Sequence, residues 1–147
     1  MANAKEKIKK LLTPEALAIL FILLLASILR FKNLEYSDYI GDEHKAFLIP
    51  GQNQTTWDFL LKQRKGPMQF VVSYIPRLIV GNFNNELAER IPFSIISVLS
   101  VPVFYLLVKK LTKNKNVSLF STSLFMVNGF IVGFGRIAQY QNLNIIF

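Results

Sequence analysis

The chain has 147 residues, of which 52% are hydrophobic and 13 are phenylalanine, more apolar side chains than a soluble domain of this size needs. It contains no cysteine, which excludes disulfides, thiolate nucleophiles and cysteine metal sites. The net charge of +8 leaves anionic lipid, phosphate-bearing ligands and nucleic acid open as partners. We therefore expect a membrane protein.

The first predicted element is a membrane helix over residues 11–29. Lysines precede it, and Glu15 is its only charged residue. At about 1.5 Å per residue this segment is roughly 28 Å long, close to the hydrocarbon thickness of a bilayer. A signal peptide is the alternative, because it shares the basic start and the apolar core. No small-residue cleavage site follows the segment, so we expect an uncleaved anchor whose N-terminus is cytoplasmic.

Two further uncharged runs, residues 91–108 and 117–135, are each long enough to cross a bilayer. The basic segment 109–116 between them is too short to be anything but a cytoplasmic turn. Residues 30–90 and 136–142 are then external loops. The last residues, 143–147, begin a fourth apolar run, which we expect to continue in a longer protein. The predicted fold is an all-α integral membrane protein, a polytopic helix bundle.

Two local contacts are predicted within these spans. Gly129 and Gly133 form a GxxxG pattern, which is typical of close helix packing. A glycine-rich phosphate loop is a poor alternative, because it needs a strand before it and a helix after it. At the start of the second span, Glu86 and Arg90 are one helical turn apart, a spacing at which opposite charges can pair.

The long external loop is predicted to contain amphipathic interfacial helices. One begins with Thr55 or Thr56 as its N-cap, places Trp57 at headgroup depth and stops at Gly66. The next apolar stretch, residues 67–80, is too short and too interrupted to span a bilayer. We expect it to lie along the membrane surface or to dip into it.

Charged residues gather in this loop just after the first span. Asp42 and Glu43 are adjacent, so they must point in different directions, and Gly41 lets the backbone turn sharply before them. Basic residues recur along the same loop at Lys45, Arg64 and Lys65. Such cations can hold a phosphate as a leaving group while a carboxylate accepts the proton of a hydroxyl or amine nucleophile.

Two other interpretations of the acidic pair stay open. Asp42 and Glu43 are also suited to hold a divalent metal, which prefers oxygen ligands. Otherwise the acids are a solvated helix end that Lys45 neutralises, and such charge clusters are common on membrane proteins. His44 lies between this acidic pair and Lys45 but has no identifiable partner in the sequence, so we treat it as incidental.

Four motifs occur in order along the chain. They are "GDEHKAF" after the first span, "QRKGPMQF" further along the loop, "NNELAERIPFSIISVLSVPVFYLLVKKL" entering the second span, and "FGRIAQYQNL" after the third. Together they resemble the N-terminal part of the GT-C glycosyltransferases. The similar branch includes the dolichyl-phosphate-mannose protein mannosyltransferases and the bacterial transferase that attaches aminoarabinose to lipid A. The resemblance covers the chain from about Leu11 onward.

The resemblance implies a membrane enzyme that moves a sugar from a polyprenyl-phosphate donor to a protein, lipid or glycan on the non-cytoplasmic face. Asp42 would be the catalytic carboxylate, with Glu43 beside it. The basic residues expected at the donor phosphate are Lys45, Arg64, Lys65 and Arg136. Enzymes of the family are several times longer, so we expect this part to be inactive alone.

The sequence departs from the family at Gln141, where many relatives have an acid. A glutamine cannot act as a base or supply a charged metal ligand. Metal dependence and a mechanism with two acids are therefore left open. A divalent metal is the one cofactor that the sequence allows us to consider.

A non-catalytic membrane protein, such as a transporter subunit or a lipid-handling scaffold, is the alternative function. It explains the helices but not the gathering of acids and lysines on the outer loop, and the predicted spans carry no ionisable residue except Glu15. Nucleic-acid binding is disfavoured, because eight of the 17 cations lie in two clusters of the kind that orient membrane helices. Abundant Lys, Asn and Ile favour the bacterial cytoplasmic membrane over the endoplasmic reticulum.

Overall fold

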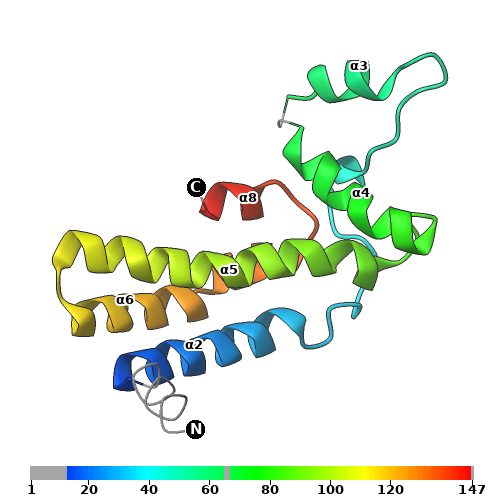
Figure 1. Cartoon of the computed structure of the whole chain (residues 1–147). Coiled ribbons are helices and arrows are strands. Elements are labelled where there is room, and N and C mark those ends of the chain that lie inside the picture. The colour runs from blue at the N-terminus through cyan, green and yellow to red at the C-terminus, as the bar shows by residue number, and fades with distance from the viewer. Residues whose placement is uncertain (1–12, 65–66, 147) are drawn as a thin grey trace, which may run out of the picture.

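The computed structural model describes residues 13–64 and 67–146, which form helices and no strands (Figure 1). The N-terminal lysines, Lys65 and Gly66 therefore lie outside the described residues. In chain order the helices are α2 (Pro14–Phe31), the 3-10 helix η1 (Glu43–Ala46), α3 (Thr56–Leu61), α4 (Met68–Val80), α5 (Glu86–Thr112), α6 (Lys115–Val127), α7 (Gly129–Phe134) and α8 (Gln141–Ile146). The all-helical prediction is confirmed.

Helix α5 is the centre of the bundle, and α2, α4, α6 and α8 pack against it (Figure 1). Its apolar contact with α2 and α6 is a buried cluster of Ile22, Ala26, Val101 and Met126. A second cluster joins α4 and α5 to the loop before α8, through Val72, Phe93 and Ala138. Most of the apolar packing in the described chain therefore meets on one helix.

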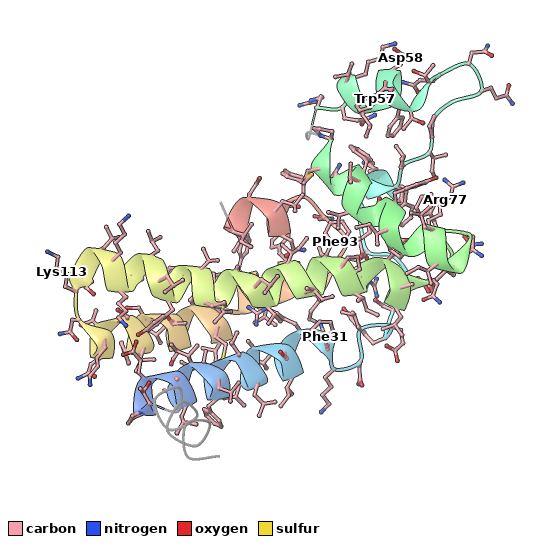
Figure 2. The ribbon with its side chains drawn as sticks, in the orientation of Figure 1. Phe31, Trp57, Asp58, Arg77, Phe93 and Lys113 are labelled. Atoms are coloured by element: carbon pink, nitrogen blue, oxygen red, sulfur yellow. The ribbon has the colours of Figure 1, made fainter. Side chains whose placement is uncertain are left out.

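The two long helices run antiparallel. Glu15, at the start of α2, accepts hydrogen bonds from the Tyr105 hydroxyl at 2.6 Å and from the Lys109 ammonium, both near the end of α5. The basic α5–α6 turn with Lys113 lies at this end, whereas Phe31 and Arg77 lie toward the opposite end (Figure 2). The start of α2 and the predicted cytoplasmic turn thus share one end of the bundle, and η1, α3 and α4 are at the other.

Local signals set the ends of α2 and α5. Thr13 caps α2, its hydroxyl accepting from the amide of Ala16 at 3.1 Å, and Pro14 follows at the first helical position. Asn85 caps α5 in the same way, and α5 ends where Lys113 adopts a left-handed conformation. Both helices are long and apolar enough to cross a membrane. Helix α5 extends beyond the predicted 91–108 at both ends.

The predicted third span, residues 117–135, does not form one continuous helix. Helix α6 ends at Val127, and Asn128 has an extended ψ of 118°. The Asn128 side chain accepts hydrogen bonds from the amides of Phe130 and Ile131, which caps α7 and starts a new helix. An asparagine side chain offers the backbone this alternative to an uninterrupted helix. Helix α8 begins inside the predicted loop 136–142, and so earlier than the fourth span expected at 143–147.

The external segment forms the short helices expected of it, with different bounds. Helix α3 has Thr55 as its N-cap but ends at Leu61, before Arg64. Helix α4 continues through Pro76 and buries one face against α5 and η1, while its other face stays apolar and exposed. The Ser73 hydroxyl donates to the carbonyl of Ala46 at 2.7 Å, which fixes α4 to η1.

Along α2 and α5 the exterior is apolar, and polar residues share the interior with the apolar clusters. Leu20, Phe21 and Leu24 of α2 are each close to 60% exposed, whereas Arg30 is completely buried. The buried face of α5 carries serines at Ser94, Ser97 and Ser100, among others. In a soluble helical protein such large apolar side chains face the core instead.

Close approach between α5 and the chain after α7 depends on Gly135. The Ser94 hydroxyl donates to the carbonyl of Gly135 at 2.9 Å, and a Cβ on this glycine would lie 2.3 Å from the Ser97 hydroxyl oxygen. The predicted packing through Gly129 and Gly133 is wrong within the described chain, because both are exposed and no atom lies within 4 Å of a Cβ there.

Gly135→Ala should destabilise the fold by about 1–3 kcal/mol, because the added methyl overpacks the contact with Ser97. Ser97 also accepts from Arg30 Nε at 2.8 Å, so displacing it loosens a second buried contact. Thermal unfolding in detergent, followed by circular dichroism, measures the change. Gly133→Ala is the matched control and should be neutral or slightly stabilising. Equal midpoints for the two variants would contradict the close approach at Gly135.

Candidate functional site

A tight turn brings the acidic pair to the end of the bundle. Gly41 has a φ of +58°, the left-handed region that glycine adopts without strain. The amide of Glu43 donates to the carbonyl of Ile40 at 3.3 Å, and the Glu43 carboxylate accepts from the amide of Ile40 at 2.7 Å. This reciprocal pair turns Glu43 inward, whereas Asp42 and Lys45 stay at the surface.

Glu43 is completely buried, and its carboxylate accepts four hydrogen bonds. Oε1 accepts from Arg90 Nε at 3.0 Å and from the amide of Ala138 at 2.8 Å. Oε2 accepts from Arg90 Nη2 at 2.8 Å and from the amide of Ile40. A buried charge needs such compensation, because an unpaired carboxylate in a protein interior is costly.

Arg90 is buried beside Glu43, and all five N–H groups of its guanidinium find acceptors. Two bind Glu43, and the others donate to the carbonyls of Leu34, Ser37 and Asp38, each at 2.9 Å. The predicted pairing of Glu86 with Arg90 is therefore corrected. The guanidinium turns to a carboxylate 47 positions away in the sequence, because that partner is buried with it.

The structure separates the two acids that the sequence placed together. Glu43 has no exposed atom with which to meet a substrate, whereas the Asp42 side chain is about half exposed. The two carboxylates therefore do not face a common ligand. The described residues also hold no group of three histidine or acidic side chains placed to bind a metal ion.

Asp42 lies in a surface hollow of about 460 Å³, which Lys45, Arg64 and Tyr140 also line. Lys45 Nζ is 2.7 Å from Asp42 Oδ1 and remains largely exposed. Three of the predicted site residues, Asp42, Lys45 and Arg64, therefore line one hollow. Asp42 and Lys45 lie at and in η1, and Arg64 lies in the segment after α3. Lys65, the remaining basic residue of this loop, lies outside the described residues.

Sequence reasoning did not identify Tyr140, which closes the hollow from the loop before α8. It lies two positions after Ala138, whose amide binds Glu43. The only signal for it was its place in "FGRIAQYQNL", the motif quoted for Arg136. The neighbouring Gln141 has a buried side-chain oxygen that accepts no hydrogen bond from the described residues.

Arg136 is not among the residues of this hollow. Its Nη1 donates to the carbonyl of Leu29 and its Nη2 to the carbonyl of Asn33, both at 2.9 Å. These contacts place Arg136 at the C-terminal end of α2, where a cation is favoured by the helix dipole. It lines a separate hollow there, together with Lys32 and Tyr36.

The ring of Tyr39 lies beside the Glu43–Arg90 ion pair. Its hydroxyl donates to the carbonyl of Phe83 at 2.5 Å, and the Arg90 guanidinium lies 5.9 Å from its ring centre. Burial raises the pKa of Tyr39, and the nearby carboxylates of Glu89 and Glu86 raise it further. The phenol therefore stays protonated at neutral pH and keeps its hydrogen bond.

Comparisons with known proteins assign no family to this arrangement. No protein-family model, no curated protein and no solved structure matches the chain. The function must therefore be argued from the residues themselves, which are one exposed acid and two cations beside a buried ion pair.

Glu43→Gln should destabilise the protein by about 3–5 kcal/mol, because it leaves Arg90 buried without a counter-charge. Each carboxylate oxygen of Glu43 accepts two N–H groups. Whichever oxygen the glutamine NH2 group replaces, it faces donors where the carboxylate offered an acceptor. Chemical unfolding in detergent measures the loss.

Asp42→Asn is the matched control for this experiment, since it makes the same chemical change one residue away at an exposed site. Its effect should stay within about 1 kcal/mol, as expected for an exposed ion pair. A loss for Glu43→Gln as small as that for Asp42→Asn would contradict the structural role of Glu43.

Proposed function

We propose that this chain is the donor-binding part of a polytopic membrane glycosyltransferase of the GT-C type. The sugar moves from a polyprenyl phosphate to an acceptor on the non-cytoplasmic face. The observation that carries the proposal is the hollow in which Asp42 meets Lys45, Arg64 and Tyr140. An acid and two cations in one accessible hollow are the groups that transfer from a phosphate-linked sugar requires.

The exposed surface of the bundle supports its placement in a membrane. Helices α2 and α5 are long and apolar enough to cross, and large apolar side chains cover their outer faces. Lipid would cover this surface without the penalty that water imposes on it. Asp42 directly precedes η1, which packs against α4, and Figure 1 shows α4 at the end of the bundle away from the α5–α6 turn. A cytoplasmic α5–α6 turn therefore supports an external Asp42.

The proposed chemistry is a single displacement at the anomeric carbon of the donor. The acceptor oxygen or nitrogen forms a bond to this carbon, and the bond from the carbon to the phosphate oxygen breaks. Asp42 accepts the proton that the nucleophile loses, and the polyprenyl phosphate leaves with the bonding electrons. Lys45 and Arg64 stabilise the charge that grows on the departing phosphate.

The contact between Lys45 and Asp42 gives this site a way to respond to the donor. The Lys45 ammonium lies 2.7 Å from the Asp42 carboxylate. A phosphate that binds Lys45 competes for this same cation, so donor binding changes the surroundings of the base. Exposed ion pairs of this kind contribute little to stability, so a bound phosphate can compete for Lys45 at little cost.

A second candidate function, a non-catalytic transporter subunit, has one observation in its favour. We expected no ionisable residue in the spans except Glu15, but α2 and α5 also contain Arg30, Glu89 and Arg90, all completely buried or nearly so. Neither carboxylate oxygen of Glu89 has a hydrogen-bond partner among the described residues. Buried ionisable groups in membrane helices are typical of ion and proton pathways.

Asp42→Asn should reduce sugar transfer by about 10²- to 10⁴-fold, the contribution typical of a general base. The assay follows radiolabelled polyprenyl-phosphate mannose and polyprenyl-phosphate aminoarabinose in membranes that contain the protein expressed from its full reading frame. Immunoblotting should show an unchanged membrane level.

Asp38→Asn is the matched control, because Asp38 is an exposed acid of the same loop and contacts Arg90 only through its carbonyl. Transfer by this variant should stay at the original level. Normal transfer by Asp42→Asn would remove the proposal and favour the transporter subunit.

Cysteine labelling tests the orientation, because the chain has no cysteine of its own. His44→Cys and Lys110→Cys place single thiols at exposed positions near opposite ends of the bundle. A membrane-impermeant maleimide should label His44→Cys in intact cells and Lys110→Cys only after permeabilisation. The reverse result would put Asp42 on the cytoplasmic side and end the proposal for an external donor site.

A further inference from the structure

A second hollow, of about 530 Å³, lies at the C-terminal end of α2. It shares no residue with the hollow around Asp42. Its walls come from the last turns of α2, from the turn that follows, and from the segment after α7. The lining residues are Ile28, Leu29, Lys32, Asn33, Tyr36 and Arg136.

Arg136 is held in this hollow by the backbone of α2. Its two donations to the carbonyls of Leu29 and Asn33 fix the guanidinium plane, and the ring of Tyr36 lies 5.6 Å from its carbon. Asn33 has a φ of +51°, which turns its carbonyl toward Arg136 at the point where the helix ends. The cation is therefore positioned in advance of any ligand.

The positive charge in this hollow is not neutralised by an acid. Arg136 binds neutral carbonyls, and within the described residues neither Arg136 nor Lys32 pairs with a carboxylate. The helix end supplies only about half a negative charge. The two cations thus leave a net positive site, and Lys32 is exposed and can reach a ligand.

The other edge of the hollow is apolar and accessible. Ile28 is 49% exposed and Leu29 is 39% exposed, and both belong to the outer surface of α2. A free phosphate would contact only the two cations. A phosphate that carries acyl chains would contact the cations and also cover the apolar edge, so the hollow matches an amphiphile.

We infer that this hollow binds the phosphate headgroup of an anionic phospholipid, with the acyl chains lying against the outer face of α2. Lys32 and Arg136 contact the phosphate oxygens, and Ile28 and Leu29 contact the start of the chains. The site is separate from the transferase proposal, because none of its residues takes part in that chemistry. It requires only that α2 lies in a membrane.

The test measures phospholipid binding to the purified full chain in a neutral detergent. Native mass spectrometry gives the affinities for phosphatidylglycerol and for phosphatidylcholine of the same acyl chains. The wild type should prefer phosphatidylglycerol. Lys32→Gln should weaken phosphatidylglycerol binding about fivefold, the effect of one cation near an anionic headgroup, and leave phosphatidylcholine binding unchanged.

Two controls make the result specific. Lys110→Gln removes an exposed lysine near the opposite end of the bundle and should not alter either affinity. Lys32→Arg keeps the charge and should restore the preference for phosphatidylglycerol. Equal binding of the two lipids by the wild type, or an equal loss for Lys110→Gln and Lys32→Gln, would overturn the site.

Inorganic phosphate separates a lipid site from a simple anion site. At millimolar concentration and matched ionic strength it should not displace phosphatidylglycerol, because it cannot cover the apolar edge. Displacement at that concentration would overturn the lipid assignment. Sugar transfer should be normal in Lys32→Gln, so this inference and the transferase proposal can fail independently.

Discussion

The fold of this chain depends on one buried ion pair, between Glu43 and Arg90. Both side chains are buried, so the free-energy cost of removing them from water offsets most of the free energy gained from their attraction. The pair is kept because its own hydrogen-bonding groups are all satisfied. The guanidinium donates to five acceptors, and the carboxylate accepts from four donors. The pair and its partners come from three stretches of the chain, which are residues 34–43, helix α5 at Arg90 and the segment before α8 at Ala138. The pair therefore sets where these segments meet, more than how stable they are.

The accessible hollow around Asp42 results from the way the Glu43–Arg90 pair brings these segments together. Asp42 precedes Glu43, so burying one side chain directs the other to the surface. Tyr140 arrives on the opposite wall because Ala138, two residues earlier, donates its amide to Glu43. The exposed Asp42 is thus positioned by a neighbour that is itself buried and fully hydrogen-bonded.

Sequence patterns predicted the features whose causes are local. The two long helices, the cap at Thr55 and the grouping of Asp42 with Lys45 follow from composition and spacing. The partner of Arg90 could not be predicted, because helical spacing favours Glu86 and no local signal identifies a buried acid far away. The helix break after α6 was not predicted, because the run 117–135 carries no charge and its one local signal, Asn128 before Gly129, also occurs within continuous membrane helices.

Arg90 holds the loop after α2 in place through the main chain of that loop. Arg90 binds the carbonyls of Leu34, Ser37 and Asp38, and of these three residues Leu34 alone is fully buried. Carbonyl oxygens are the same whatever residue carries them. Evolution can therefore replace the side chains at positions 35–38 while the path of the loop is kept. This loop can in this way vary in charge and size on one unchanged scaffold.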